Sequence, residues 1–481
     1  GRPTLVTGTA GVGKTVFAAQ FLVGGIVRGE PGVLVTFEES PVALRQNLAG
    51  FGWDVADWEA RGLWAFVDVS PSFEEETVTA GAFDLTALLA RVEHAVRRVG
   101  AKRVAVDPLG AVFSQIAAGA DLRRELLRMA ATLRRLEVTA VVTAERGEEG
   151  GRSALPGLEE FVADNVVILR NTLTEERRRR TLEVLKLRGC PHRKGEHPFS
   201  IMEDGGIVII PLTAMELNQS SSEARISIGN ADIDAMCGGG LFRDSIVLVS
   251  GATGTGKTLL STGFVAAGAA AGERGLIFGF EESRAQLIRN AAGWGYDFPA
   301  QERDGLLQLV CDYPEARELE DHLITIKQAV ETFGPRRVAV DSLTALERVS
   351  TPRAYREFVV ALTSFLKRLE ITGLFTSTSE ALLGGESITD AHISTITDTI
   401  LLLRYVEMFG EMRRGMTVLK MRGSAHDKAI REFIIDGVGV HVREPFRTTS
   451  GILQGVPVHM SATEIRDREE VRTRRLRGGE P

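Results

Sequence analysis

Short apolar runs alternate along the chain with longer segments in which apolar residues recur at helical spacing. The runs are rich in β-branched residues, which predicts strands. They comprise residues 3–8, 32–39 and 103–107 and, later in the chain, 245–251, 275–282 and 337–341. Residues 121–137 instead carry leucines at 122, 126, 127, 133 and 136, which predicts a helix with one apolar stripe. This alternation predicts an α/β fold, a parallel sheet flanked by helices on both faces.

The pattern occurs twice, which indicates an internal duplication. GTAGVGKT and TFEES in the first half return as GATGTGKT and GFEES, and Lys14 and Lys257 are 243 residues apart. RVAVD and VLKLRG return as RVAVD and VLKMRG after 234 residues, as the pair Asp107 and Asp341 illustrates. A single net difference of nine residues in the intervening loops explains the change of offset. Two copies of one domain are predicted.

The boundary between the copies is predicted at the polar, serine-rich stretch 215–227, which is typical of a linker. The first domain then covers 1–214 and the second 228–450, followed by a C-terminal loop and tail at 451–481. The second copy begins with a lead-in at 228–242 that has no counterpart, because Gly1 aligns with Asp244. We therefore expect that a short N-terminal lead-in is missing from the first copy.

Composition narrows the function classes. The chain has 481 residues and a net charge of −7, which disfavours an electrostatically driven nucleic-acid binder. Its three cysteines are far apart and lack metal-site spacing, so neither a disulfide framework nor a zinc site is indicated. There is no apolar run of about 18 residues and no leader-like N-terminus. These features predict a soluble, cytoplasmic protein.

Both copies carry the GxxxxGK[ST] pattern between a predicted strand and a predicted helix. Glycines let the backbone N–H groups face a phosphate, and the following helix adds its positive N-terminal end. Lys14 and Lys257 would reach the β- and γ-phosphates of ATP, and Thr15 and Thr258 would coordinate Mg²⁺. A chance glycine-rich turn would not explain two occurrences in this context. The two predicted phosphate loops comprise Gly8, Thr9, Ala10, Gly11, Val12, Gly13, Lys14 and Thr15, and Gly251, Ala252, Thr253, Gly254, Thr255, Gly256, Lys257 and Thr258.

Carboxylates end the neighbouring predicted strands. Asp107 and Asp341 are candidates for a magnesium contact through water, although an aspartate after a strand can also be a helix cap. One difference is that Pro108 follows the first aspartate and Ser342 the second.

Two glutamate pairs follow the second predicted strand of each copy, at the same distance from the lysine. They are Glu38 with Glu39, and Glu281 with Glu282. A carboxylate there can polarise a water or a hydroxyl against the γ-phosphate, although a solvated turn is the alternative.

Two cations lie on one face of a later strand by period-two alternation: Lys186 with Arg188, and Lys420 with Arg422. Their partner could be a local carboxylate or, in a ring, the γ-phosphate bound to a neighbouring subunit. The basic run EERRRR at 175–180 lies between strand-like segments and is interpreted as a hairpin tip.

With these motifs, the chain resembles the KaiC family, the tandem RecA-type ATPases of the cyanobacterial circadian clock. The resemblance extends from residue 1 to about residue 460, and SITDAHISTITDTI (387–400) and KMRGSAHDKAIREF (420–433) are its most specific segments. It implies a homohexameric double ring that binds ATP and Mg²⁺ between subunits. The first domain would hydrolyse ATP slowly, and the second would phosphorylate and dephosphorylate its own Ser394 and Thr395, with Thr389 as a regulatory neighbour. Contacts to the neighbouring subunit's nucleotide are implied for Lys186, Leu187, Arg188 and His192, and for Lys420, Met421, Arg422, Ser424 and His426.

The two copies differ where the acceptor hydroxyls lie. At the 234-residue offset Ser394 aligns with Glu160, and Thr395 with Phe161. We therefore expect an ATPase in the first copy, with Glu38 polarising water and Glu39 beside it, and an autokinase in the second, with Glu281 as general base and Glu282 supporting it. Ala425 stands where the family typically has an aromatic residue.

The resemblance also implies partners. A KaiB-type protein would bind around 70–84, a KaiA-type protein would engage 451–460, and a sensor histidine kinase would carry the output. The arginine-rich tail at 461–481 resembles the family less than the rest of the chain does.

Two other function classes stay open. A DNA-dependent RecA-like ATPase would need a basic, aromatic-lined channel, but the chain has four Trp and four Tyr and is acidic. An ATP-assembled scaffold without phosphotransfer would leave Ser394 and Thr395 unmodified.

Overall fold

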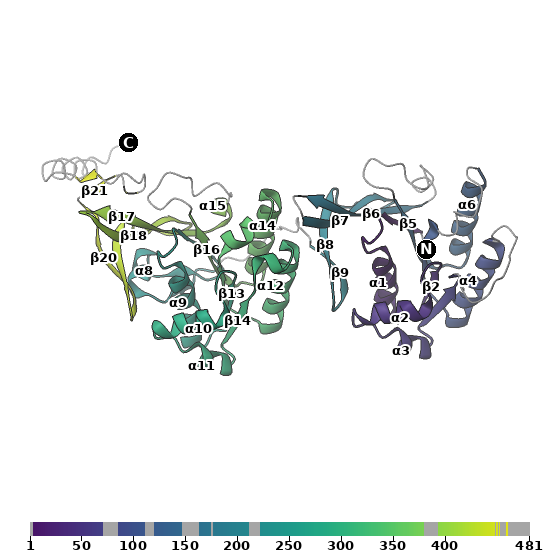
Figure 1. Ribbon diagram of the computed structural model, residues 1–481, viewed down its shortest axis with the longest axis horizontal. Coiled ribbons are helices and arrows are strands. Elements are labelled where there is room, and N and C mark those ends of the chain that lie inside the picture. Colours follow the sequence, from purple (N-terminus) through teal and green to yellow (C-terminus); the bar gives the residue numbers. More distant parts are fainter. Residues whose placement is uncertain are drawn as a thin grey trace. The chain divides into compact units, whose positions relative to one another are not determined.

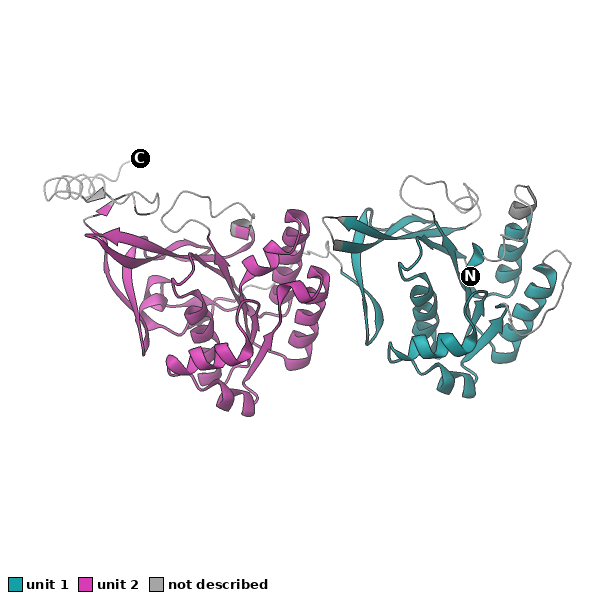
Figure 2. Cartoon of the chain, in the orientation of Figure 1, with its two compact units in different colours: residues 1–211 teal, residues 212–481 magenta. Residues whose placement is uncertain are grey.

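The computed structural model of the chain describes residues 3–70, 85–110, 120–146, 163–174, 177–210, 222–379, 393–447, 449–450, 452 and 458–459. The chain divides into two compact units, Gly1–Pro211 and Leu212–Pro481 (Figure 2). Each unit contains one large sheet with helices packed against it (Figure 1). Among the described residues, no helix is long and apolar enough to cross a membrane.

Unit 1 is built around a sheet with the strand order β3-β2-β4-β5-β1-β6-β7-β8-β9. Its strands are β1 (Thr4–Gly8), β2 (Gly32–Thr36), β3 (Trp64–Asp68), β4 (Arg103–Asp107), β5 (Thr139–Glu145), β6 (Asn165–Thr174), β7 (Arg177–Leu187), β8 (Glu196–Met202) and β9 (Gly206–Ile209). Its described helices are α1 (Lys14–Ile26), α2 (Pro41–Ala49), α3 (Val55–Ala60), α4 (Leu85–Val99) and α6 (Ala120–Arg135).

Unit 2 repeats this order as β14-β13-β15-β16-β12-β17-β18-β19-β20. The strands of this sheet are β12 (Ile246–Gly251), β13 (Gly275–Gly279), β14 (Leu307–Cys311), β15 (Arg337–Asp341), β16 (Thr372–Thr378), β17 (Thr399–Met408), β18 (Glu411–Met421), β19 (Arg431–Asp436) and β20 (Gly439–Pro445). Two small pairings join β10 (Arg225–Ile226) to β11 (Leu241–Phe242) and β21 (Thr449–Ser450) to β22 (Val458–His459). The described helices are α8 (Ala231–Met236), α9 (Lys257–Ala270), α10 (Arg284–Gly293), α11 (Phe298–Arg303), α12 (Leu319–Phe333), α13 (Leu343–Arg348), α14 (Pro352–Arg368), α15 (Ile393–Ile396) and the 3₁₀ turn Pro314–Ala316.

The predicted α/β fold is confirmed in both units. Strands β1 to β6 are parallel to their neighbours, as are β12 to β17, and the last three strands of each sheet form an antiparallel extension. The hairpin at 175–180 and the strands of the Lys-x-Arg motifs were predicted, but the rest of this antiparallel extension was not. The double ring stays a prediction.

Helices cover both faces of the sheet because alternate residues of a buried strand point to opposite sides. In β2, Val33 and Val35 pack in the core beneath α4, whereas Leu34 packs in the core beneath α1. The parallel arrangement therefore brings the carboxyl ends of β1, β2, β4 and β5 to one edge, where ligands bind in such folds.

Three local expectations need correction. In α6, Leu126 and Leu133 are buried, but Leu127 is 51% exposed, so it is not part of the apolar stripe. The hydroxyl-rich stretch just before β17 has a composition that by itself favours a β-rich segment, but its residues Ile393–Ile396 form the helical turn α15. Within the expected linker, Arg225–Ile226 pair with the lead-in as a short strand.

Candidate functional site

In both units a glycine loop joins the central strand to a helix. Helix α1 begins at Lys14 directly after Gly13, whose φ is 108°, and α9 begins at Lys257 after Gly256, whose φ is 102°. Neither helix has a side-chain cap, so the first backbone N–H groups are available to a phosphate. These free N–H groups at the start of each helix fit the binding of a nucleoside triphosphate.

Glycine is required at these two positions for a second reason. A Cβ on Gly13 would lie 2.8 Å from Cδ1 of Ile201, and one on Gly256 would lie 2.7 Å from Cδ1 of Ile435. The left-handed φ strains any residue with a Cβ, and the end of the isoleucine side chain would have to move to make room for it. The antiparallel extension, which supplies the two isoleucines, thus closes one side of each loop.

The two P-loop lysines are buried at the centre of their loops. Nζ of Lys14 donates to the carbonyl oxygens of Gly8 at 3.1 Å and Thr9 at 2.8 Å. Nζ of Lys257 donates to those of Gly251 and Ala252, both at 3.0 Å. Burial lowers the pKa of both lysines, and the carboxylates around them oppose this shift.

Asp107 and Asp341 end β4 and β15, two strands away from the P-loop strand. Each accepts a hydrogen bond from a fully buried threonine on the intervening strand, Thr143 in unit 1 and Thr376 in unit 2. Thr258 also hydrogen-bonds Asp341, so this P-loop threonine and this aspartate lie together. Burial raises the pKa of Asp341. The peptide bond after each aspartate is cis, whether proline or serine follows.

The two glutamates of each pair have different surroundings. Glu38 and Glu281 are exposed, whereas Glu39 and Glu282 are partly buried. Asn47 donates to Glu39, and Asn290 donates to Glu282, both at 2.9 Å. The first glutamate of each pair is therefore open to solvent, and the second is held by the following helix.

Electrostatics links these residues to the lysines. Burial raises the pKa of Glu38, and the charges of Glu145 and Asp107 raise it further. Glu281 and Asp341 both stabilise the charged form of Lys257. The carboxylates of each predicted set therefore lie close enough to the P-loop lysine to act on one bound phosphate.

Sequence reasoning missed Glu145, which lies at the end of β5. Its Oε1 is 3.9 Å from Nζ of Lys14. Glu145 is paired with Gly8 in the sheet, and the equivalent partner of Gly251 is Thr378. The signal that could have found it is the strand 139–145, whose last residue reaches the level of the P-loop. Thr143 and Thr376 were missed because they reach the aspartates only across neighbouring strands. The two residues that hold the second glutamate of each pair, Asn47 and Asn290, were also missed.

The Lys-x-Arg motifs lie at the ends of β7 and β18, at the opposite edge of the sheet from the P-loop of their own unit. A β-bulge immediately precedes each motif, with Leu185 and Leu419 as the extra residues. Nζ of Lys186 donates to the Ala163 carbonyl at 2.9 Å, and Nζ of Lys420 to the Thr397 carbonyl at 2.7 Å.

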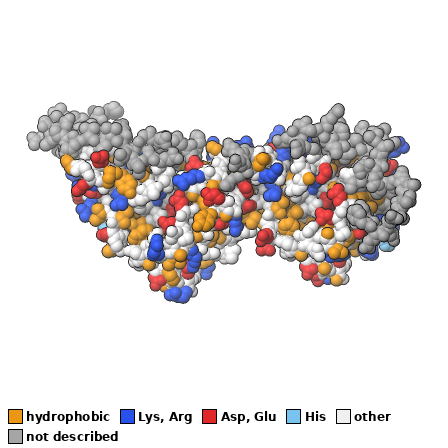
Figure 3. All heavy atoms as spheres, in the orientation of Figure 1, with side chains coloured by type: hydrophobic (Ala, Val, Ile, Leu, Met, Phe, Trp, Pro, Cys, Tyr) orange, Lys and Arg blue, Asp and Glu red, His pale blue; other side chains and the backbone are white. Residues whose placement is uncertain are grey.

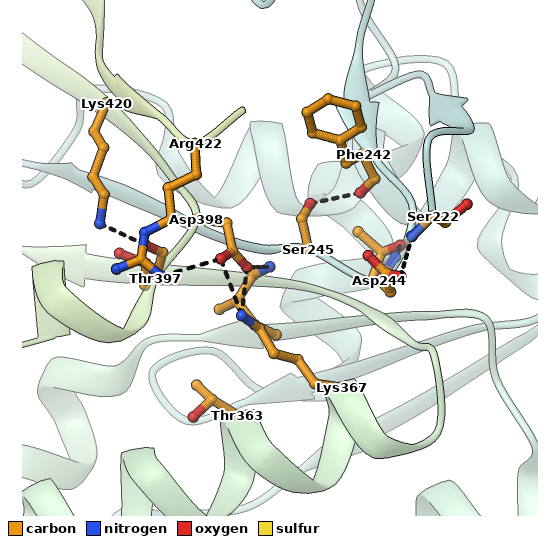
Figure 4. Close-up of polar contacts among 12 residues, drawn as sticks. Ser222, Phe242, Asp244, Ser245, Thr363, Lys367, Thr397, Asp398, Lys420 and Arg422 are labelled. Atoms are coloured by element: carbon orange, nitrogen blue, oxygen red, sulfur yellow. Dashed lines mark hydrogen bonds and ion pairs between the residues drawn. The ribbon is translucent and has the colours of Figure 1, made fainter. Parts of the chain in front are cut away.

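The arginines of these motifs contact aspartates of their own unit. Nη1 of Arg188 donates to Oδ1 of Asp164 at 3.2 Å. Nη1 of Arg422 lies 3.7 Å from Oδ1 of Asp398 (Figure 4). Both arginine side chains are more than half exposed, at 60% and 54%. The local carboxylate that sequence reasoning left open is therefore present, and the guanidinium groups still face solvent.

The other residues expected to contact a neighbour's nucleotide are near these motifs. Leu187 and His192 are partly buried, and the Met421 side chain is buried in the core of unit 2. The Ser424 hydroxyl accepts a hydrogen bond from Arg225 at 2.6 Å, and Nδ1 of His426 lies 3.5 Å from the Ser424 carbonyl oxygen. A contact from Met421 to a neighbour would have to come from its main chain.

Several predicted positions lie outside the described residues. Thr389, the segment 71–84 and most of 451–481 belong to this group, as do Glu160 and Phe161. Ser394 and Thr395 lie in α15, but only their backbone is described. The run 175–180 lies in the β6–β7 hairpin, where Thr174 pairs with Arg177 and residues 175–176 are outside the description.

The described part of the face shown in Figure 3 presents no basic channel. On the face shown in Figure 3, acidic and basic side chains are interspersed over both units. This distribution offers no support for the nucleic-acid alternative.

Comparison with known proteins gives one consistent answer. A family model described as "ATPase: KaiC" matches residues 1–214 and 226–446. The chain is 61% identical over 465 residues to the circadian clock protein KaiC3 of Synechocystis sp., covering 97% of this chain and 92% of the relative. It is 53% identical over 465 residues to the circadian clock oscillator protein KaiC of Synechococcus elongatus and to that of Thermosynechococcus vestitus, in each case covering 96% of this chain and 89% of the relative.

Proposed function

The chain belongs to the KaiC family, and from this we propose that it is an ATP-driven circadian timing protein. In this proposal unit 1 is a slow ATPase, and unit 2 is a serine/threonine autokinase and autophosphatase. One observation carries it: both units hold a complete set of P-loop lysine, P-loop threonine, strand-end aspartate and exposed glutamate. Only the second unit follows this set with the adjacent hydroxyls of Ser394 and Thr395.

In unit 1, Lys14 and the N-terminus of α1 bind the phosphates of ATP. Thr15, and Asp107 through water, would hold Mg²⁺, which would supply positive charge against the phosphates. Glu38 polarises the attacking water, and Glu39 lies beside Glu38 and supports it. The Thr143 hydroxyl donates a hydrogen bond to Asp107 and so fixes the carboxylate at the end of β4.

In unit 2, Lys257, Thr258 and Asp341 play the corresponding parts. Glu281 removes the proton from the hydroxyl of Ser394 or Thr395 of an adjacent subunit, and that oxygen bonds to the γ-phosphorus as the bond to the ADP oxygen breaks. Glu282 supports this base and is held by Asn290. In the reverse reaction the phosphoryl group on Ser394 or Thr395 returns to ADP, and this removal accounts for the autophosphatase activity.

The Lys-x-Arg motifs support a reaction across subunits. In the pairing of β12 with β17, Gly251 at the P-loop lies opposite Leu403, and Val247 lies opposite Thr399. The start of β17 is therefore four residues along the strand from the P-loop. At about 3.3 Å per residue this is roughly 13 Å, and Arg422 lies at that far edge. Arg422 and Lys420 are therefore poorly placed for their own nucleotide, which supports a role toward a neighbour's. A homohexamer with ATP at each subunit interface satisfies this geometry, and Arg188 and Lys186 would serve the first ring.

The relatives' names place them in the circadian clock, and we extend the same setting to this chain. The proposed partners are a KaiB-type protein at 70–84, a KaiA-type protein at 451–460 and a sensor histidine kinase for output. The proposed compartment is the cytoplasm.

The test is to follow phosphate on the chain during incubation of the full-length protein with Mg-ATP for a day at two temperatures. Intact mass and phosphopeptide analysis should find phosphate on Ser394 and Thr395 that appears and is later lost. The Glu281→Gln protein should bind ATP and remain unphosphorylated. ATP consumption without phosphate on the chain would refute the autokinase and favour the scaffold, and stimulation by single-stranded DNA would favour the nucleic-acid alternative.

A further inference from the structure

An aspartate at the start of β17 connects three parts of unit 2. Oδ2 of Asp398 accepts the backbone N–H of Ile246 at 2.9 Å and lies 2.8 Å from Nζ of Lys367 (Figure 4). Its Oδ1 faces Nη1 of Arg422 at 3.7 Å. The backbone N–H of Arg422 also donates to the Asp398 carbonyl at 2.9 Å. One carboxylate, 19% exposed, thus contacts the strand that leads to the P-loop, helix α14 and the arginine at the far edge.

In unit 1 the corresponding aspartate is Asp164, which lacks the backbone N–H donor that Asp398 has. Oδ2 of Asp164 contacts Nη2 of Arg134 at 2.9 Å, and its Oδ1 accepts from Arg188 at 3.2 Å. Burial opposes ionisation of Asp164, but Arg134 and Arg188 outweigh it and hold its pKa below the usual range. The residue that corresponds to Ile246 is Pro3, which has no N–H to donate.

The two aspartates receive different sets of donors. Asp398 divides its oxygens among Lys367, the Ile246 N–H and Arg422, whose Nη1 lies 3.7 Å from Oδ1. Asp164 faces a proline in place of that backbone donor and makes a direct hydrogen bond to Arg188.

We propose that Asp164 and Asp398 are positioning residues that aim Arg188 and Arg422 at the nucleotide bound to the neighbouring subunit. Each carboxylate holds its arginine at the sheet edge, at a fixed distance from the lysine of the same motif. This inference rests on the proposed function across subunits.

The test is a double-mutant cycle in the full-length, assembled protein. Asp398→Asn keeps an oxygen acceptor for the Ile246 N–H and removes the charge that Arg422 faces. It should slow phosphorylation of Ser394 and Thr395, by on the order of tenfold for a coupled pair. In the Arg422→Gln background, which is slow already, Asp398→Asn should have no further effect.

A matched control variant distinguishes the loss of arginine positioning from a loss of folding stability. Glu273 is a carboxylate of similar exposure, 16%, between Arg243 and Arg337, and none of these residues is in the site. Glu273→Gln should lower the Tm of unit 2, as Asp398→Asn does, yet leave the phosphorylation rate unchanged. Size-exclusion chromatography with ATP checks that each variant assembles.

The outcomes distinguish two failures. If Arg422→Gln leaves the rate unchanged, the transfer across subunits itself is wrong. If Arg422→Gln slows the reaction but Asp398→Asn slows it by the same factor with and without Arg422, only the positioning role is refuted. Asp164→Asn with Arg188→Gln, assayed by ATP hydrolysis in unit 1, repeats the test if the Asp398 variant does not assemble.

Discussion

The carboxylate of Glu145 lies 3.9 Å from the ammonium group of Lys14, and the equivalent position beside Lys257 is occupied by Thr378. At this strand position the first site therefore has a carboxylate and the second a neutral hydroxyl. Because Glu145 is 54% exposed, solvent screens this charge, but it still faces the place where a phosphate would bind.

Glu145→Thr should strengthen ATP binding at the first site. At about 4 Å in water, one charge pair is worth about 1 kcal/mol, which corresponds to roughly a fivefold change in affinity. The measurement is titration with a fluorescent ATP analogue in a Lys257→Ala background, which removes binding at the second P-loop. Thr378→Glu in a Lys14→Ala background should weaken binding at the second site by a similar factor. Unchanged affinity in both variants would mean that position 145 does not face the phosphates.

The pH dependence of ATP hydrolysis in unit 1 should report on Glu38. Its pKa is raised above the ordinary value of 4.5, first by burial and then by Glu145 and Asp107. A general base works only when ionised, so hydrolysis should be present above this raised pKa and lost as the pH falls through it. Glu145→Thr removes a charge that raises this pKa and should move the acid limb of kcat/KM to lower pH.

Glu39→Gln is the control for that shift, because Glu39 makes the smallest of the contributions to the pKa of Glu38. Its acid limb should move less than that of Glu145→Thr. An acid limb that stays in place in both variants would show that another group limits hydrolysis at low pH.

Thr376→Val should weaken the use of Mg²⁺ in unit 2. The Thr376 hydroxyl is fully buried and donates to Asp341, so valine of similar shape leaves that carboxylate with one partner fewer. A lost hydrogen bond to a buried charged group costs about 1–3 kcal/mol and favours the protonated carboxyl, which binds Mg²⁺ poorly. We expect the Mg²⁺ concentration for half-maximal autophosphorylation to rise.

The control for this prediction is Thr363→Val. Thr363 is equally buried, but its hydroxyl donates to the Val359 carbonyl within α14. This variant should keep the wild-type Mg²⁺ dependence. If both variants respond alike, the effect of Thr376 is one of packing and not of its bond to Asp341.

Residues close together in the sequence were predicted well. Strands β4 and β15 have the predicted bounds, because RVAVD has an apolar, β-branched centre between two charged ends. The P-loops follow from a local pattern with a local geometry. Side chains that meet across strands were missed, because Glu145 and Thr376 reach the site only through the order β4-β5-β1 and its counterpart. Periodicity assigns a face to each residue, but it does not say which strands are neighbours.

A buried arginine distinguishes the stability of the two units. Arg404 in β17 is 7% exposed, and its Nε and Nη1 atoms have no hydrogen-bond partner among the described residues. Burial lowers the pKa of Arg404. The equivalent residue in unit 1, Arg170, pairs with Glu183 at 2.6 Å and Glu196 at 3.3 Å. At the 234-residue offset these two glutamates correspond to Thr417 and Ile430.

Arg404→Gln should therefore raise the free energy of unfolding of unit 2, by about 1 kcal/mol, because an unpaired buried charge is replaced by a neutral group. Arg170→Gln should instead lower that of unit 1 by about 1–3 kcal/mol, since it leaves two carboxylates without their partner. Thermal and denaturant unfolding of both variants measures the contrast, and Thr417→Glu, which restores a carboxylate to β18, should stabilise unit 2 only when Arg404 is present. A loss of stability in Arg404→Gln that matches the loss in Arg170→Gln would contradict this reading, and would show that Arg404 binds an anion supplied by a part of the chain beyond the described residues or by a neighbouring subunit.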